Sequence, residues 1–361
     1  MIRSTWLQFR TQATVGIGGL LVVAAVLAVT GPHLVHLFDT DVATCAAHGD
    51  CSIAISSFLQ TDHGLQIGLD VLVVVVPALI GIFWGAPLVA RELETGTYRL
   101  AWTQSVTRTR WLAVKLGVVG LAGMVVAGLL SLAVTWWSSP IDRANLGVFS
   151  SFDQRDLVPV GYAAFAFALG AATGLVVRRT VPAMAVTLVV FVTTRLLVNH
   201  FVRPQLLIAP ERHSYPLALG TTISGYGGAN GSPASLFPGA PNIPNAWILS
   251  TDIVDKTGHP LTAGVVSRAC PQLATVLGGP GPATGVQVKG GGLSSAGPAP
   301  AAANQALQNC VSKVGASYHE LVTYQPPGHY WPLQWYELAI YLGAALVIGG
   351  ICLWRIRRSL S

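Results

Sequence analysis

Residues 91–115 read RELETGTYRLAWTQSVTRTRWLAVK and lie between two long apolar runs. This stretch is denser in charged, aromatic and hydroxyl side chains than any other part of the chain. A short basic, amphipathic segment between two membrane spans lies at the membrane surface, because its apolar side chains favour lipid and its charges favour water. The stretch therefore predicts a membrane protein with a polar element exposed at one face of the membrane.

The composition also indicates that much of the chain lies in lipid. The chain has 361 residues, of which 52% are hydrophobic and only 10% are charged. Soluble globular proteins carry roughly 25% charged residues. Inside a bilayer the backbone must pair its polar groups within helices or closed barrels, and apolar runs that are continuous rather than alternating favour helices. We therefore predict an all-α polytopic membrane protein.

Six apolar runs have the length of a membrane span. A helix needs about 20 residues to cross about 30 Å of hydrocarbon. The predicted spans cover residues 15–37, 65–90, 112–137, 159–177, 181–201 and 335–354. Residues 1–201 thus hold five helices with the polar element at 91–115, residues 202–334 form a large loop or subdomain, and residues 335–361 form the sixth helix and a basic tail.

The basic residues predict the orientation. Lys and Arg favour short cytoplasmic loops. Both termini, residues 91–115 and the Arg178-Arg179 pair fall on one side of the predicted spans, whereas the short loops on the other side hold only Arg143 and Arg155. We expect both termini in the cytoplasm, the chain in the cytoplasmic membrane, and residues 202–334 outside. Basic residues gathered at span ends also argue against a nucleic-acid partner, which needs a continuous basic stripe.

The cysteines agree with this topology. Cys45, Cys51, Cys270 and Cys310 all fall in segments assigned to the outside. An oxidising compartment favours disulfides. Four cysteines allow three connectivities, of which local pairing, Cys45 with Cys51 and Cys270 with Cys310, is the simplest. Four unpaired thiols are the alternative.

The polar element also carries a family resemblance. Residues 87–97 (PLVARELETGT), 102–108 (WTQSVTR) and 111–115 (WLAVK) resemble the ABC-2 type permeases. These are membrane subunits of ATP-binding-cassette exporters whose ATPase is a separate protein. The family pattern is an acidic residue, then Gly-Thr, then Gln or Ser before a basic residue, and a Lys that opens the next helix. Every part of the pattern stands here in order.

The resemblance implies a mechanism. It implies a homodimer of permeases in membrane lipid, with ATP and Mg bound by the partner ATPase and no cofactor in this chain. It implies that an amphipathic drug, lipid or peptide is exported. An amphipathic coupling helix between the second and third spans would contact the ATPase through Arg91, Glu92, Glu94, Gly96, Thr97, Arg99, Trp102, Gln104, Ser105, Arg108 and Arg110, and Lys115 would anchor the third span at the headgroups. The alternative is a solvated basic loop that only sets topology.

Other function classes find less support in the sequence. The chain has no Gly-x-x-x-x-Gly-Lys-Ser/Thr loop and no nucleophile–base signature, so we expect no nucleotide site and no enzyme activity. The spacing of the His and Glu residues near 319–329 is poor for zinc. One rival is an integral-membrane sensor or enzyme acting through residues 202–334, where Glu211, Asp252, Asp255 and Glu320 are scattered. A membrane scaffold without transport is another.

Two ionisable groups interrupt the apolar runs. Asp70 opens the second span and Arg195 lies in the fifth. Because charges inside membranes usually pair or serve a function, we predict an Asp70–Arg195 pair. The alternative is that both side chains reach outward to the interface. Gly170 and Gly174 form a small-xxx-small face that either packs closely against another helix or faces lipid by accident.

Overall fold

The computed structural model describes the chain in two compact units. The described residues are 2–45, 51–96, 107–205, 207–217, 223–226, 235–238, 243–262, 265, 268–269, 286–289, 292–294, 309 and 312–358. One unit comprises Met1–Ile208 with Gly328–Ser361, and the other comprises Ala209–Pro327. The second unit falls inside the segment predicted to form the large loop or subdomain.

The prediction of six spans is confirmed. Helices long and apolar enough to cross a membrane cover Arg10–Ala43, His63–Thr95, Thr109–Ala144, Val158–Val177, Thr180–Val202 and Pro327–Arg358. The chain is therefore a multi-pass integral membrane protein. Four of these helices have 32 to 36 residues, or about 50 Å at 1.5 Å per residue. They exceed the roughly 30 Å of hydrocarbon, so their polar ends extend beyond it.

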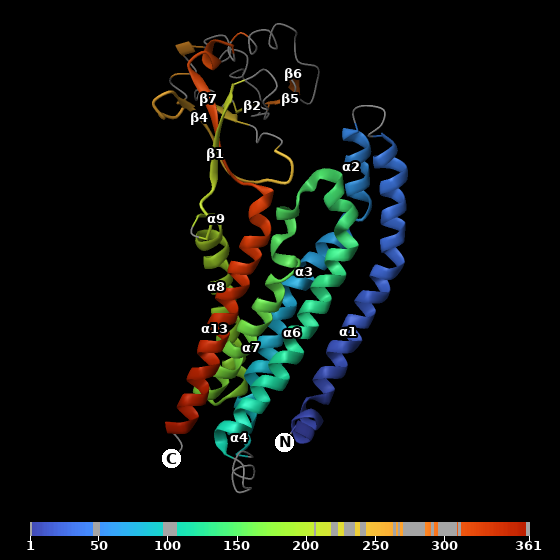
Figure 1. The fold of residues 1–361 in the computed structure, drawn as a ribbon, viewed down its shortest axis with the longest axis vertical. Coiled ribbons are helices and arrows are strands. Elements are labelled where there is room, and N and C mark those ends of the chain that lie inside the picture. Colours follow the sequence, from blue (N-terminus) through green and yellow to red (C-terminus); the bar gives the residue numbers. More distant parts are fainter. Residues whose placement is uncertain are drawn as a thin grey trace. The chain divides into compact units, whose positions relative to one another are not determined.

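Short π- and 3₁₀-helical segments interrupt or join these helices. In chain order the elements are α1 Ile2–Leu37, η1 Phe38–Ala43, α2 Ser52–Thr61, α3 His63–Leu79, η2 Ile80–Gly85, α4 Ala86–Thr95, α6 Arg108–Ile141, η3 Asp142–Leu146, η4 Val148–Gln154, α7 Val158–Val177, α8 Thr180–Leu197, η5 Val198–Val202, α9 Arg203–Gln205, η6 Pro327–His329 and α13 Tyr330–Arg358. At one end of the bundle α1 begins and both α4 and α13 end (Figure 1). We call this the termini end.

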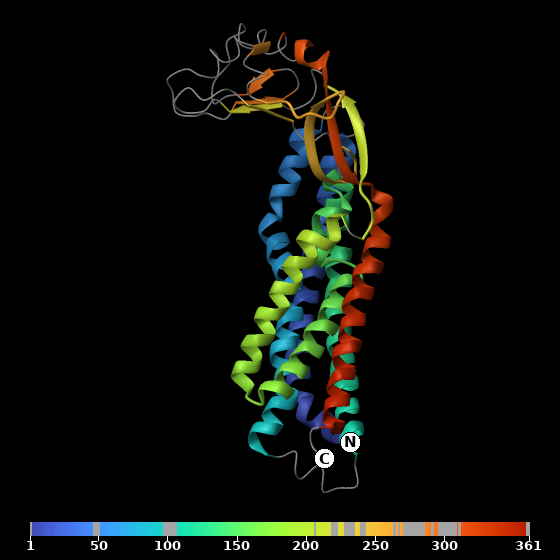
Figure 2. The ribbon, with the colours of Figure 1, turned by 90° about the vertical axis from the view of Figure 1, so that its left-hand side faces the viewer.

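The central helix is α7. Of its apolar window 72% is buried, against 39% or less for every other span. It packs against α3, η2, α4, α6, α8 and α13, and Figure 2 shows α13 running along the bundle beside it. The sequence of α7 is rich in alanine and glycine. Small side chains on every face let neighbouring helices approach from all sides.

Four glycines bring α7 and η2 into backbone contact. An added Cβ would lie 2.7 Å from the Ala166 carbonyl oxygen if placed on Gly81, and 2.6 Å from the Phe167 carbonyl oxygen if placed on Gly85. On the facing helix, a Cβ on Gly174 would lie 2.5 Å from the Ala86 carbonyl oxygen, and Gly170 is equally crowded. The small-xxx-small face of α7 is therefore a packing surface, and its partners are Gly81 and Gly85 of η2 and Ala86 of α4.

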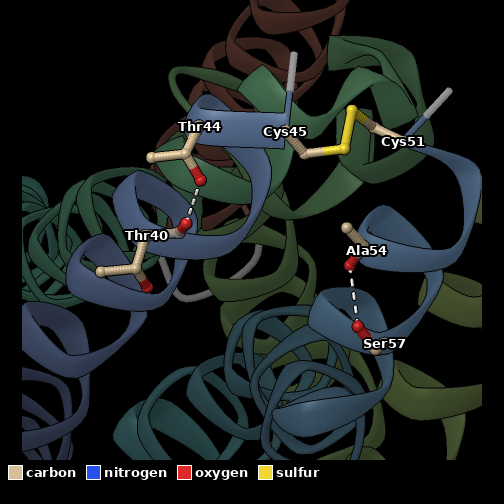
Figure 3. Close-up of a disulfide and its surroundings, with 6 residues drawn as sticks. All are labelled: Thr40, Thr44, Cys45, Cys51, Ala54 and Ser57. Atoms are coloured by element: carbon tan, nitrogen blue, oxygen red, sulfur yellow. Dashed lines mark hydrogen bonds between the residues drawn. A yellow bond between two sulfur atoms is a disulfide. The ribbon is translucent and has the colours of Figure 1, made fainter. Parts of the chain in front are cut away.

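A disulfide joins the end of the first span to α2. Cys45 and Cys51 are bonded to each other (Figure 3), which confirms the local pairing predicted for them. On either side of the bond, Thr44 donates a hydrogen bond to the Thr40 carbonyl and Ser57 donates one to the Ala54 carbonyl. The helix α2, which begins directly after Cys51, lies at the end of the bundle opposite the termini end (Figure 1). Cys270 and Cys310 lie outside the described residues.

The second unit contains strands, which the sequence analysis did not predict. One antiparallel sheet has the order β1-β7-β4, with β1 at Glu211–Pro216, β7 at Tyr318–Gln325 and β4 at Trp247–Asp255. A second has the order β3-β2-β5-β6, formed by Ser235–Pro238, Ile223–Tyr226, Val286–Lys289 and Gly292–Ser294. Alternate residues of β7 are buried, as expected for a sheet with one covered face.

Candidate functional site

The polar element begins as a continuation of the second span. Val89 and Ala90 of α4 are buried, whereas Arg91 and Glu94 are not. The helix ends at Gly96, whose φ of 72° is left-handed. Only glycine adopts that conformation without steric cost. The two carboxylates therefore stand on the last turn of a long helix, just before the chain reverses.

Glu92 and Lys115 connect the two helices that flank the polar element. The Lys115 ammonium pairs with the Glu92 carboxylate and lies 4.7 Å from the centre of the Trp111 ring. Only 4% of Lys115 is exposed. Lys115 is predicted from the sequence to anchor the third span at the lipid headgroups, and the structure adds that its side chain is buried between α4 and α6. The end of α4 and the start of α6 are therefore held together by a charge pair.

Glu94 connects the same turn to a third helix. Its Oε2 accepts hydrogen bonds from the Thr180 backbone nitrogen at 3.1 Å and from the Thr180 hydroxyl at 2.8 Å. Thr180 is the first residue of α8. A carboxylate at a helix N-terminus satisfies a free N–H group and complements the helix dipole. The last turn of α4 therefore contacts α6 about two turns from its start and α8 at its first residue.

The remaining predicted contact residues divide into two groups. Arg91 and Arg110 are exposed, and Arg108 is the first residue of α6. Thr97, Arg99, Trp102, Gln104 and Ser105 lie outside the described residues. Among the described residues, the segment 97–106 follows the end of α4 and precedes α6. The end of α4 contacts α6 and α8 near their N-termini. A force on that segment would therefore act on α4, α6 and α8 together.

We expect Glu92→Gln to destabilise the protein by about 1–3 kcal/mol, because it leaves the buried Lys115 without its counter-charge. The adjacent Arg91→Gln alters an exposed side chain and should stay within about 0.5 kcal/mol of wild type. Thermal unfolding of the two variants in the same detergent measures the difference. Equal unfolding temperatures would show that the pair contributes no stability.

A second group of charges is buried near the opposite end of the bundle. The Arg203 guanidinium donates from Nε to Glu337 Oε2 and from Nη2 to Glu337 Oε1, both at 2.8 Å. The Tyr162 hydroxyl donates to Glu337 Oε1 at 2.6 Å and accepts from Arg203 Nη2 at 3.1 Å. Glu337 is fully buried and the other two are nearly so. This group joins α9, α13 and α7.

Arg195 belongs to the same group, which corrects the predicted Asp70–Arg195 pair. Its Nη2 lies 3.3 Å from Asp153 Oδ2, and its guanidinium lies 4.1 Å from the centre of the Tyr162 ring. Asp153 also pairs with Arg203. No ion pair among the described residues includes Asp70. The physical reason is that η4 places Asp153 within reach of α8, and this nearer carboxylate takes the arginine.

Glu337 and Arg203 are functional-site candidates that the sequence alone did not predict. Glu337 is an acidic residue near the start of the last predicted span, and an isolated carboxylate there predicts a cationic partner. Arg203 was assigned to the following loop because it lies two residues past the end of the fifth predicted span. Two arginines and two carboxylates thus form a neutral network that fastens η4, α7, α8, α9 and α13.

Arg203→Leu should destabilise the protein by about 3–5 kcal/mol, because it leaves Glu337 buried without a counter-charge. Arg195→Leu should cost less, about 1–2 kcal/mol, since Asp153 keeps Arg203 as a partner. Denaturant unfolding of the full chain compares the two. A larger loss for Arg195→Leu than for Arg203→Leu would contradict this order.

The second unit does not gather its carboxylates into one described site. Asp252 is exposed. Asp255 accepts hydrogen bonds from the Thr257 and His259 backbone nitrogens and so closes its own turn. The Thr257 hydroxyl also donates to this carboxylate and has the largest effect on it. Together these hydrogen bonds lower the pKa of Asp255 to about 2. Among the described residues no three His, Cys, Asp or Glu side chains are placed to hold a metal ion.

Glu320 is different, because it is buried on β7 with no hydrogen-bond partner for either carboxylate oxygen. Burial raises the pKa of its carboxyl above the usual value. The unfolded chain loses this proton near pH 4.3, whereas the folded chain holds it to higher pH. Stability is therefore greatest below the pKa of the unfolded chain and falls as pH rises through the raised folded value.

Glu320→Gln should remove this pH dependence and slow hydrogen exchange at β7 above pH 5, because a neutral amide is cheaper to bury than a carboxylate. Asp252→Asn, on an exposed residue of the adjacent strand, is the matched control and should leave the exchange profile unchanged. Hydrogen–deuterium exchange of the full chain between pH 4 and 8 makes the comparison. Parallel profiles for Glu320→Gln and wild type would contradict the assignment.

Comparison with known proteins gives one match. Residues 17–203 match a protein-family model described as ABC-2 membrane transporter related. The matched region contains most of the first span, the next four spans in full and the whole polar element between α4 and α6. No curated protein and no solved structure matches the chain.

Proposed function

The chain belongs to the ABC-2 membrane transporter related family, and from this premise we propose that it is the permease subunit of an ATP-binding-cassette exporter. The observation that carries the proposal is that the family match covers residues 17–203, which include the polar element. The six spanning helices supply the path through the membrane. A separate ATPase subunit, which binds ATP and Mg, supplies the energy.

The termini end faces the cytoplasm. Two observations support this orientation. Arg91, Arg110 and the last-turn Arg355, Arg357 and Arg358 belong to helix ends at the termini end (Figure 1), and basic residues favour the cytoplasmic side. The Cys45–Cys51 disulfide adjoins α2 at the opposite end, and disulfides persist on the oxidising side of a cytoplasmic membrane.

The ATPase subunit docks on residues 91–110. Support comes from the way the flanking helices are joined: Glu92 pairs with Lys115 of α6, and Glu94 caps α8. A docked subunit that moved during ATP hydrolysis would displace three helices together instead of bending one loop. Exposed Arg91 and Arg110 offer positive charge to an acidic surface on that subunit.

Two permease copies pair in the membrane and move an amphipathic substrate, such as a drug, lipid or peptide, between them. The proposal rests on the family for the dimer and for the substrate range. The alternative in which the second unit acts as an enzyme or sensor has less support, because its described carboxylates do not converge on one site. Asp255 closes its own turn, Asp252 is exposed and Glu320 is buried alone.

Affinity purification of the tagged full chain from its host membranes tests the proposal. We expect wild type to retain an ATPase subunit that carries a Walker motif, identified by mass spectrometry. The double variant Arg91→Glu, Arg110→Glu should lose at least tenfold of that subunit, because reversed charges repel an acidic surface.

The matched control is Arg357→Glu, which reverses a basic residue at the same end of the bundle outside the polar element. It should retain the ATPase subunit at the wild-type level. Purified wild-type chain without any Walker-motif protein, or equal loss in Arg357→Glu, would count against docking at residues 91–110.

A further inference from the structure

An apolar cavity lies inside the first unit, between α1, α3 with η2, and α6. Its volume is about 820 Å³. Sixteen residues line it, and all except Thr11 and Gln12 are apolar or glycine. Water in such a space would find few hydrogen-bond partners. The lining therefore selects a hydrocarbon occupant.

The cavity opens sideways toward the surface of the spans. Three of its lining residues are largely exposed: Val15 at 73%, Val22 at 66% and Phe83 at 52%. All three lie in spanning helices. In a bilayer such exposed apolar side chains contact acyl chains, so the mouth of the cavity faces the hydrocarbon of the membrane and not water.

The length of the cavity corresponds to one leaflet. On α1 the lining runs from Thr11 to Val23, and on α3 with η2 it runs from Leu72 to Trp84. Each run covers about 18 Å at 1.5 Å per residue. One leaflet contributes about half of the roughly 30 Å of hydrocarbon. An acyl chain that lies in one leaflet therefore has the right length to fill the cavity.

The polar residues mark one end of this space. Gln12 donates from Nε2 to the Phe83 carbonyl at 3.0 Å, which ties α1 to η2 there. Thr11 lies beside it, and the exposed Arg10 precedes both. The other end is lined by Leu72 and Val23. This polarity matches a phospholipid, whose headgroup is polar and whose chain is not.

We propose that this cavity binds an acyl chain of a membrane phospholipid, with the headgroup beside Arg10, Thr11 and Gln12. The site lies within one copy of the chain, and the inference goes beyond the proposed permease function and stands without it. A helix from a second copy laid over the mouth is the other possible occupant, and the polar groups at one end, where Gln12 bonds the Phe83 carbonyl, favour the phospholipid.

Two adjacent glycines of α1 provide a matched test. An added Cβ meets nothing within 4 Å at either Gly18 or Gly19. Both glycines are exposed, but Gly19 lines the cavity and Gly18 does not. Gly19→Leu therefore places a side chain in the cavity without a clash at its Cβ, and Gly18→Leu adds the same side chain outside it. Both changes raise helix propensity equally.

Native mass spectrometry of the full chain purified in mild detergent measures the bound lipid. Wild type and Gly18→Leu should each retain one phospholipid per chain, and Gly19→Leu should show at least a tenfold lower occupancy. Wild-type chain without retained phospholipid would overturn the proposal. So would equal retention by the two leucine variants.

Fluorescence in bilayers provides an independent readout. Trp84 lines the cavity, and bromine on a neighbouring acyl chain quenches tryptophan by contact. Fluorescence is measured in phosphatidylcholine vesicles with and without brominated chains, for each protein and for the same protein carrying Trp84→Phe. The difference between the two is the fluorescence of Trp84. Gly19→Leu should reduce the quenching of Trp84, and Gly18→Leu should not. A dimer lost in Gly19→Leu with unchanged quenching would assign the cavity to a second copy and overturn the proposal.

Discussion

The backbone contact between α7 and η2 is the constraint on which the first unit depends. Gly170 lies against Gly81 and Gly85, and Gly174 lies against Ala86 of α4, so closely that a single added Cβ on any of these four glycines would overlap backbone. In a membrane the hydrophobic effect does not drive helices together, because lipid tails are as apolar as the side chains. Close packing of small residues drives helix association instead. Because α7 also packs against α3, α4, α6, α8 and α13, this crossing helps to set the position of the whole bundle around it.

Polar contacts hold the helices together at the two ends of the bundle, where the small residues of α7 do not. Near the termini end, Glu92 and Glu94 tie the last turn of α4 to α6 and α8. Near the opposite end, Glu337 and Asp153 bind two arginines between α7, α8, α9 and α13. Charges this deeply buried contribute little net free energy compared with apolar packing, but an unpaired partner is costly. They therefore penalise alternative arrangements more than they stabilise the native one.

The sequence predicted what depends on local composition. Continuous apolar runs located all six spans, and a six-residue separation made Cys45 and Cys51 a natural pair. It could not predict which distant groups meet. Arg195 has Asp153 as its partner because η4 folds back toward α8, and nothing local to either residue encodes that fold. Likewise, the spacing of Gly170 and Gly174 indicated a packing face, but it did not indicate that Gly81 and Gly85 belong to the facing segment. The strands of the second unit were not predicted, because such short segments give a weaker sequence signal than a long apolar span.

The arrangement also bears on how motion would pass through the bundle. Close-packed interiors deform little, since side chains and backbone already fill the space at crystal-like density. Displacement of the last turn of α4 therefore cannot be absorbed at the glycine crossing and must move α7 or slide along it. Because α7 carries Tyr162 at its other end, that motion reaches Arg203 and Glu337 directly. The central helix packs against α4 at one end and is hydrogen-bonded to Glu337 and Arg203 through Tyr162 at the other. It thus gives the proposed permease a physical link between the ATPase side and the far side of the membrane.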